Sequence, residues 1–133
     1  MLTRRTLLAA TGVALASPAL AQSYPTRPIS LLVGFAPGGG TDIIARLLQP
    51  GLQEEFGQPI AIENRAGGSG TIAAAQNARA RPDGYGMLMT TVSASAVVPP
   101  TMNPPPFDIL RDQTAVVLAG TVPLVAVVPP SSP

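Results

Sequence analysis

Short apolar runs and longer segments of helical periodicity alternate along the first two thirds of the chain. Each run is rich in Ile, Leu, Val or Met and is bounded by Gly or Pro nearby, as is typical of buried strands. The runs lie at residues 30–35, 60–63 and 87–91. The pattern therefore predicts three strands separated by two longer intervals.

Both intervals carry helical signals. The first predicts a helix over 43–56, weakened midway by Pro50 and Gly51 and ended by Gly57. The second interval is rich in Ala and predicts a helix over 71–79. Strands and helices that alternate through short connections indicate an α/β fold, a parallel sheet with flanking helices. On the first helix, the apolar residues predicted to share one face are Ile44, Leu47, Leu48 and Leu52.

The pattern changes after Thr91. Nine of the 16 prolines fall between Pro99 and Pro133, so a long helix is not expected there. Apolar runs at 114–119 and 124–128 predict two further short strands.

A glycine-rich stretch, Val33–Asp42, joins the first strand to the first helix. Glycine at positions 38, 39 and 40 lets the backbone approach a ligand where any Cβ would obstruct it. The free N–H groups and the dipole of the helix that follows attract an anion. Thr41 or Asp42 suits the N-cap position. A tight turn that needs glycine only for its geometry explains the same residues, so both interpretations stand.

Two well-known phosphate motifs fail in this stretch on single residues. Gly34 to Thr41 has phosphate-loop spacing, but Gly40 stands where Lys is required, and the chain has no lysine. A dinucleotide motif begun at Gly38 requires glycine at the position of Ile43.

Composition narrows the chemistry further. With no Cys and no His, the sequence offers no thiol chemistry, no usual zinc site and no Ser-His-Asp arrangement, so we expect no metal, no cofactor and no enzyme activity. The formal net charge of +1 includes Arg4 and Arg5; without them the balance is −1. This balance gives no argument for nucleic-acid binding.

The amino-terminal residues predict export. Arg4 and Arg5 precede an apolar run, and Ala19–Ala21 forms a cleavage signal, so the mature chain is expected to begin at Gln22 in the periplasm. The paired arginines fit the twin-arginine route, although a general secretory signal can also carry them.

Taken together, the motifs of the mature chain resemble the N-terminal part of the substrate-binding proteins of tripartite tricarboxylate transporters, the Bug family of periplasmic solute receptors. The order and approximate spacing of these motifs agree with that family. The matching residues are Tyr24–Ile29, Phe35–Asp42, Phe56–Pro59, Glu63–Gly67, Pro82–Tyr85, Phe107–Asp108 with Asp112, and Val122–Pro123 with Val127–Pro129.

The resemblance implies a periplasmic-binding-protein-like fold whose two domains close on a small carboxylate solute, and a role as a monomer that serves the membrane components of a transporter. The first loop is then expected to help hold the carboxylate through backbone N–H groups and bridging waters, with added hydroxyl contacts from residues after the third strand. Asp42 is expected to act as a helix cap rather than as a direct contact. The implied site residues are Phe35, Ala36, Gly38, Gly39, Gly40, Thr41 and Asp42, with Thr91 and Ser93.

The resemblance also suggests a division of the chain. We expect a signal peptide over 1–21, the N-terminal part of the first ligand-binding domain over 22–113, and crossover strands with the start of a second domain over 114–133. On this division the fold is truncated, with the first domain incomplete and the second mostly missing. Two alternatives remain open, a non-functional truncated fragment and half of an α/β enzyme that binds an anionic nucleotide or acyl group.

Overall fold

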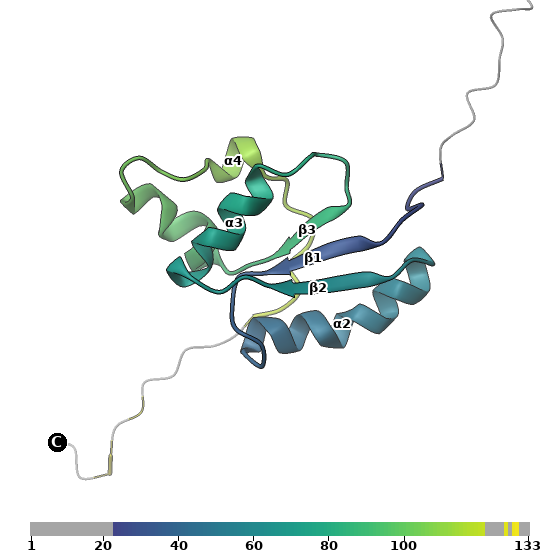
Figure 1. Cartoon of the computed structure of the whole chain (residues 1–133). Helices are drawn as coiled ribbons and strands as arrows, with labels where there is room; N and C mark the ends of the chain where they lie inside the picture. The colour runs from purple at the N-terminus through teal and green to yellow at the C-terminus, as the bar shows by residue number, and fades with distance from the viewer. Residues whose placement is uncertain (1–22, 122–126, 128, 131–133) are drawn as a thin grey trace, which may run out of the picture.

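The centre of the molecule is a parallel sheet of three strands, seen in a computed structural model that describes residues 23–121, 127, 129 and 130 (Figure 1). The strands are β1 (Ile29–Val33), β2 (Ile60–Asn64) and β3 (Gly86–Met89), in the order β2-β1-β3. In the register, Ile29 lies opposite Ile60 and Ser30 lies opposite Gly86. The three predicted strands and their parallel arrangement are therefore confirmed, and their carboxyl ends lie at one edge of the molecule.

Helices cover opposite faces of this sheet. Helix α2 (Gly40–Phe56) lies on one face and α3 (Thr71–Ala78) on the other (Figure 1). Alternate residues of β1 supply the α2 side, where Ile29, Leu31 and Val33 are buried against Ala45. On the other side, Leu88 packs against the alanines of α3 and against Phe107. Alternate residues of the central strand thus supply the core under α2, whereas β3 supplies Leu88 to the core under α3.

The face that α2 turns to the sheet differs in part from the predicted one, of which Leu52 does pack against the core. Ala45 is fully buried, whereas Leu47 is 75% exposed. Gln49 donates to the carbonyl of Ile60 (2.7 Å), and Gln53 accepts from the Ile60 N–H (3.1 Å). Two glutamines therefore face the sheet because they satisfy the backbone at the start of β2, where apolar side chains would leave polar groups unpaired. The predicted helix end is confirmed, since Gly57 follows with a positive φ of 61°.

Beyond β3 the described residues form short elements only. A π-helical turn, η2 (Ser93–Val97), leads into a 3-10 turn, η3 (Pro99–Thr101), and then into α4 (Ile109–Asp112). Asp108 caps α4 and accepts from the N–H groups of Leu110 and Arg111. An earlier 3-10 turn, η1 (Gly68–Gly70), precedes α3.

The strand predicted at 114–119 is wrong for the described structure, because these residues have no regular hydrogen bonding. Val116, Val117 and Leu118 are largely exposed there. The run has strand-forming residues, but within the described part of the chain no neighbouring strand pairs with it, and a strand needs a partner. The predicted signal peptide and nearly all of the strand predicted at 124–128 lie outside the described residues.

A group of side chains ties the lead-in before β1 to the turn before β3. The Tyr24 hydroxyl donates to the Gly84 carbonyl (2.6 Å) and Arg27 pairs with Asp83 (2.9 Å). The Arg27 guanidinium also lies 3.8 Å from the centre of the Tyr85 ring, as in a cation–π contact. These contacts fix the chain at the amino ends of the strands.

Candidate functional site

The loop between β1 and α2 forms a compact turn at the carboxyl end of the sheet. The Gly39 N–H donates to the Ala36 carbonyl (3.2 Å), which closes the turn. Gly38 takes a φ of +81°, a conformation that residues with a Cβ rarely adopt. The backbone geometry alone therefore requires glycine at this position, as expected if the stretch is a tight turn.

Helix α2 begins earlier than predicted. Gly39 is the N-cap residue and makes no side-chain cap hydrogen bond, so the prediction of Thr41 or Asp42 as the N-cap is wrong. The glycine run reaches helical geometry at Gly40, which moves the cap upstream of both polar residues. Within α2, the Ile43 N–H donates to the carbonyl of this N-cap residue, Gly39 (2.9 Å).

Three backbone N–H groups remain free in the first turn of α2. Those of Gly40, Thr41 and Asp42 donate to no acceptor in the part of the chain that the structure describes. Neighbouring N–H groups in the first turn point roughly along the helix axis, toward its open end. Together with the helix dipole they make this end electropositive, so the geometry suits an anion.

The Asp42 side chain is buried beneath the loop. It is only 1% exposed, and its Oδ2 accepts from the Gly38 N–H (2.8 Å) and from Arg46 Nε (2.8 Å). Its Oδ1 accepts from Asn64 Nδ2 (2.8 Å). Because the carboxylate is enclosed by these partners, it is turned into the fold and not toward the open end of the helix.

These partners also hold the carboxylate in its charged form. The hydrogen bonds from Arg46, from the Gly38 N–H and from Asn64 lower the pKa of Asp42 far below its usual value, against the opposing effect of burial. The same pairing raises the pKa of Arg46. The two opposite charges therefore offset each other next to the loop, which leaves the end of the helix electropositive.

Asn64, the last residue of β2, connects the loop to the sheet. Its Nδ2 donates to the Phe35 carbonyl (3.0 Å) as well as to Asp42, and its Oδ1 accepts from Arg46 Nη2 (3.3 Å). Neither Asn64 nor Arg46 was predicted as a site residue. The spacing of four between Asp42 and Arg46 is a signal for a pair on one helix face, but no local pattern indicates that Asn64 lies beside them.

A second glycine-rich segment, Gly67–Gly70 around η1, packs against the start of the loop between β1 and α2. A Cβ on Gly70 would lie 2.8 Å from the Ala94 Cβ and 3.2 Å from the Phe35 ring, and one on Gly34 would lie 3.1 Å from the Gly70 backbone. Glycine is therefore needed at Gly34 and Gly70 so that the segment after β1, η1 and η2 can pack together. The Phe35 ring packs here, which gives that residue a structural contact.

The hydroxyl residues after β3 lie at the same edge of the sheet. Met89 is paired with Val33, so two residues further on Thr91 follows β3 as Phe35 follows β1. The Thr91 hydroxyl accepts from the Ala94 N–H (3.3 Å), the contact of an ordinary turn hydroxyl. Ser93 is exposed at the start of η2.

Neither a metal-binding group nor a membrane-spanning helix is found among the described residues. Among them, no three His, Cys, Asp or Glu side chains gather as a metal-binding group. No helix within the same residues has the length and apolar character needed to cross a membrane.

Comparison with known proteins gives consistent matches. The family described as the tripartite tricarboxylate transporter family receptor matches residues 44–133. Protein BugT of Bordetella pertussis is 42% identical over 117 residues, which are 87% of this chain and 36% of that protein. A Pseudomonas sp. (strain P51) protein from the tcbD-tcbE intergenic region is 41% identical over 136 residues, 97% of this chain and 39% of that protein.

Solved structures agree with these matches. One described as a periplasmic transporter has a TM-score of 0.63 and 46% identity, covering 67% of this chain and 30% of that one. A protein of R. palustris solved with adipate has a TM-score of 0.52 and 44% identity, covering 53% of this chain and 24% of its own. The chain spans somewhat more than a third of the length of the curated relatives described above.

Proposed function

Because the chain belongs to the tripartite tricarboxylate transporter receptor family, we propose that it binds a small carboxylate solute at the loop between β1 and α2. The observation that carries the proposal is the set of three free N–H groups at Gly40, Thr41 and Asp42. Backbone donors at a helix N-terminus bind carboxylates without needing a cationic side chain. This suits a chain that has no lysine or histidine.

The comparison with the adipate-bound relative supports the ligand class. That protein is 44% identical to the aligned half of this chain and shares its fold there. A dicarboxylate such as adipate has a terminal carboxylate that can accept hydrogen bonds from two or three adjacent N–H groups. We therefore infer a small carboxylate as the ligand of this chain.

Within the proposed site the residues have different roles. Gly38 and Gly39 shape the turn, and Gly40, Thr41 and Asp42 offer backbone donors. Phe35 and Ala36 form the base of the turn, where the Ala36 carbonyl accepts from Gly39. Hydroxyl contacts are assigned to Thr91 and Ser93, which follow the neighbouring strand.

We further propose that the chain is exported, is cleaved before Gln22, and acts in the periplasm with the membrane components of its transporter. Family membership and the amino-terminal sequence support this. N-terminal sequencing of the protein from a periplasmic extract tests it, and an intact Met1 end would contradict it.

A titration followed by NMR tests the proposed site. The amide signals of the ¹⁵N-labelled chain are recorded with increasing adipate at constant ionic strength. We expect the Gly40, Thr41 and Asp42 amides to shift together, because they would donate to the carboxylate. Adipamide, which has the same length but no charge, is the matched control ligand and should shift them far less. Equal shifts with both ligands, or none with adipate, would contradict the proposal.

A further inference from the structure

We propose that Asp42 and Asn64 are positioning residues for the carboxylate site. Their hydrogen bonds fix the loop so that the free N–H groups of α2 converge on one point. The inference rests on the function proposed above and adds two side chains that do not themselves touch the ligand.

The first observation is that the network holds both ends of the loop. Asp42 binds the Gly38 N–H (2.8 Å), just before the N-cap, and Asn64 binds the Phe35 carbonyl (3.0 Å), just after β1. Asn64 and Asp42 are joined directly (2.8 Å). A glycine-rich loop has many accessible conformations, so fixing it at two points removes much of the entropy that binding would otherwise cost.

The second observation is that the Asp42 carboxylate accepts hydrogen bonds on both of its oxygens. Three donors converge on it, from Gly38, Arg46 and Asn64. A carboxylate can accept all three, whereas an amide offers one oxygen and would turn its NH₂ toward at least one of these donors. The Asp42→Asn variant therefore breaks the network with little change in side-chain size.

The same bonds keep the negative charge of Asp42 away from the ligand. The carboxylate is 1% exposed and pairs with Arg46, whose own side chain is about half exposed. An unpaired carboxylate one turn from the anion would weaken binding, so pairing it inside the fold lets an acidic residue support an anion site.

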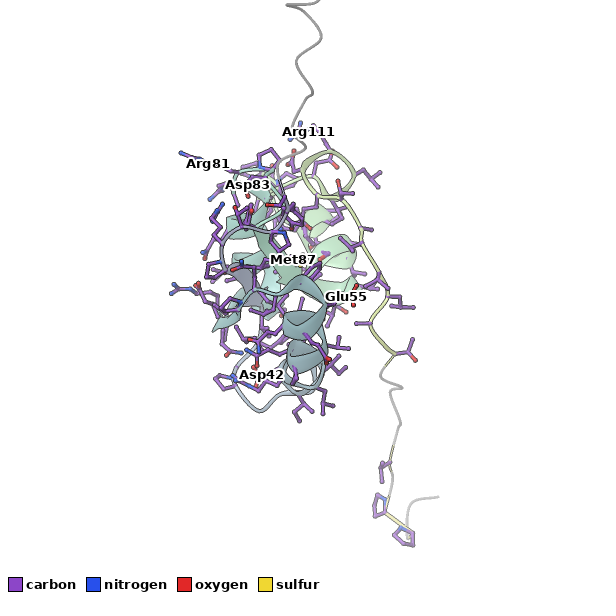
Figure 2. The ribbon with its side chains drawn as sticks, turned by 90° about the vertical axis from the view of Figure 1, so that its right-hand side faces the viewer. Asp42, Glu55, Arg81, Asp83, Met87 and Arg111 are labelled. Atoms are coloured by element: carbon purple, nitrogen blue, oxygen red, sulfur yellow. The ribbon has the colours of Figure 1, made fainter. Side chains whose placement is uncertain are left out.

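A second aspartate provides a matched control for a purely structural role. Asp112 also accepts from the N–H four residues earlier, that of Asp108 (2.9 Å), and from an arginine, Arg111 Nε (2.7 Å). Figure 2 shows Arg111 and Asp42 at opposite ends of the molecule. Asp112→Asn thus removes the same kind of network far from the loop.

The experiment compares Asp42→Asn, Asn64→Leu and Asp112→Asn with the unaltered chain. For each, the melting transition, the exchange rate of the Gly38 amide and the adipate-induced shifts of the Gly40 and Thr41 amides are measured. We expect Asp42→Asn to speed exchange at Gly38 and to weaken adipate binding about tenfold, the loss of roughly one charge-assisted hydrogen bond. Asp112→Asn should lower the melting temperature without changing adipate affinity.

The outcomes separate this inference from the proposed function. Adipate shifts in the unaltered chain that persist at the same affinity in Asp42→Asn would overturn the positioning role alone. Their absence in the unaltered chain would overturn the proposed function and this inference with it. If Asp42→Asn does not fold, Asn64→Leu decides: it leaves the Gly38–Asp42 bond in place but releases Phe35, and unchanged affinity there would overturn the inference.

Discussion

Asp42 is a buried carboxylate held in its charged form, so we expect acid to destabilise the fold. Its pKa in the folded chain is held far below the usual value by Arg46, Gly38 and Asn64. Asp112 shows the same effect more weakly, its pKa lowered to about 2 by Arg111 and by the Asp108 N–H. In both cases the unfolded chain binds protons more readily than the folded chain as the pH falls.

This difference predicts the direction of the pH dependence. Because the folded pKa values lie below the unfolded ones, both carboxylates stabilise the fold above the usual carboxyl pKa. That contribution is lost progressively as the pH falls below about 5. Urea unfolding at a series of pH values measures the loss. The Asp42→Asn variant should show a flatter dependence, and an unaltered slope would contradict the role given to this residue.

Two glycines of the loop, Gly38 and Gly40, should affect the stability of the fold in opposite directions when replaced by alanine. Gly38 has a φ of +81°, so Gly38→Ala should destabilise the fold by about 1–2 kcal/mol even though a Cβ there meets no atom within 4 Å. Gly40 is helical and its Cβ would also meet open space, so Gly40→Ala should be neutral or stabilising by up to ~1 kcal/mol. Thermal melting of the two variants gives the comparison; equal effects would contradict it.

At the scale of elements, the order of strands and helices could be predicted from the sequence, but the rotation of α2 could not. Apolar periodicity indicated a face that contains Leu47, which is exposed, while Gln49 and Gln53 face the start of β2. Periodicity records which residues are apolar; it does not record which backbone groups of a distant strand need a partner. The strand predicted at 114–119 failed for a related reason, because strand pairing is not a local property.

The candidate site, like the fold, could be predicted from the sequence only in part. The glycine loop and its place at the helix N-terminus follow from local order along the chain. Asn64 lies 22 residues from Asp42, and only the parallel pairing of β1 with β2 brings the end of β2 beneath the loop. A contact made by topology leaves no spacing signal in a single sequence.

Helix α2 carries a proline whose removal should stabilise it. The helix runs without interruption from Gly40 to Phe56, with Pro50 inside and exposed. Proline lacks the N–H that would bond to the carbonyl four residues earlier, so Pro50→Ala should gain up to about 3 kcal/mol. Gly51→Ala, at an open position next to it, should gain only about 1 kcal/mol. Chemical unfolding ranks the two, and a destabilised Pro50→Ala variant would contradict the prediction.

For the molecule as a whole, the two edges of the sheet differ. The outer strand β2 carries a charged side chain, Glu63, whereas β3 at the other edge reads Gly, Met, Leu, Met and carries none. Charges on an edge strand discourage further pairing, and their absence permits it. Both edges of the described sheet are open, and pairing of a further strand is less opposed by charge at β3 than at β2.

The affinity for a ligand is likewise a property of the whole molecule. A helix N-terminus contributes ~0.3–2 kcal/mol to an anion, and each hydrogen bond to a charged group ~1.5–3 kcal/mol. Two such bonds with the dipole reach about 3–8 kcal/mol before the ligand's lost freedom is subtracted, while micromolar affinity needs about 8 kcal/mol. We expect the 133-residue chain to bind adipate no tighter than millimolar. Calorimetric titration measures this, and micromolar binding would contradict it.

The contacts that Tyr24 and Arg27 make with the turn before β3 have a practical consequence for handling the protein. They hold the chain at the amino ends of the parallel strands, while the glycine loop lies at their carboxyl ends, and Figure 2 shows Asp83 and Asp42 correspondingly far apart. A tether attached ahead of Ser23 therefore leaves from the side opposite the proposed binding loop. The molecule can be coupled to a sensor surface through that end with the loop turned toward the flowing solution, an orientation that coupling at Thr41 would abolish.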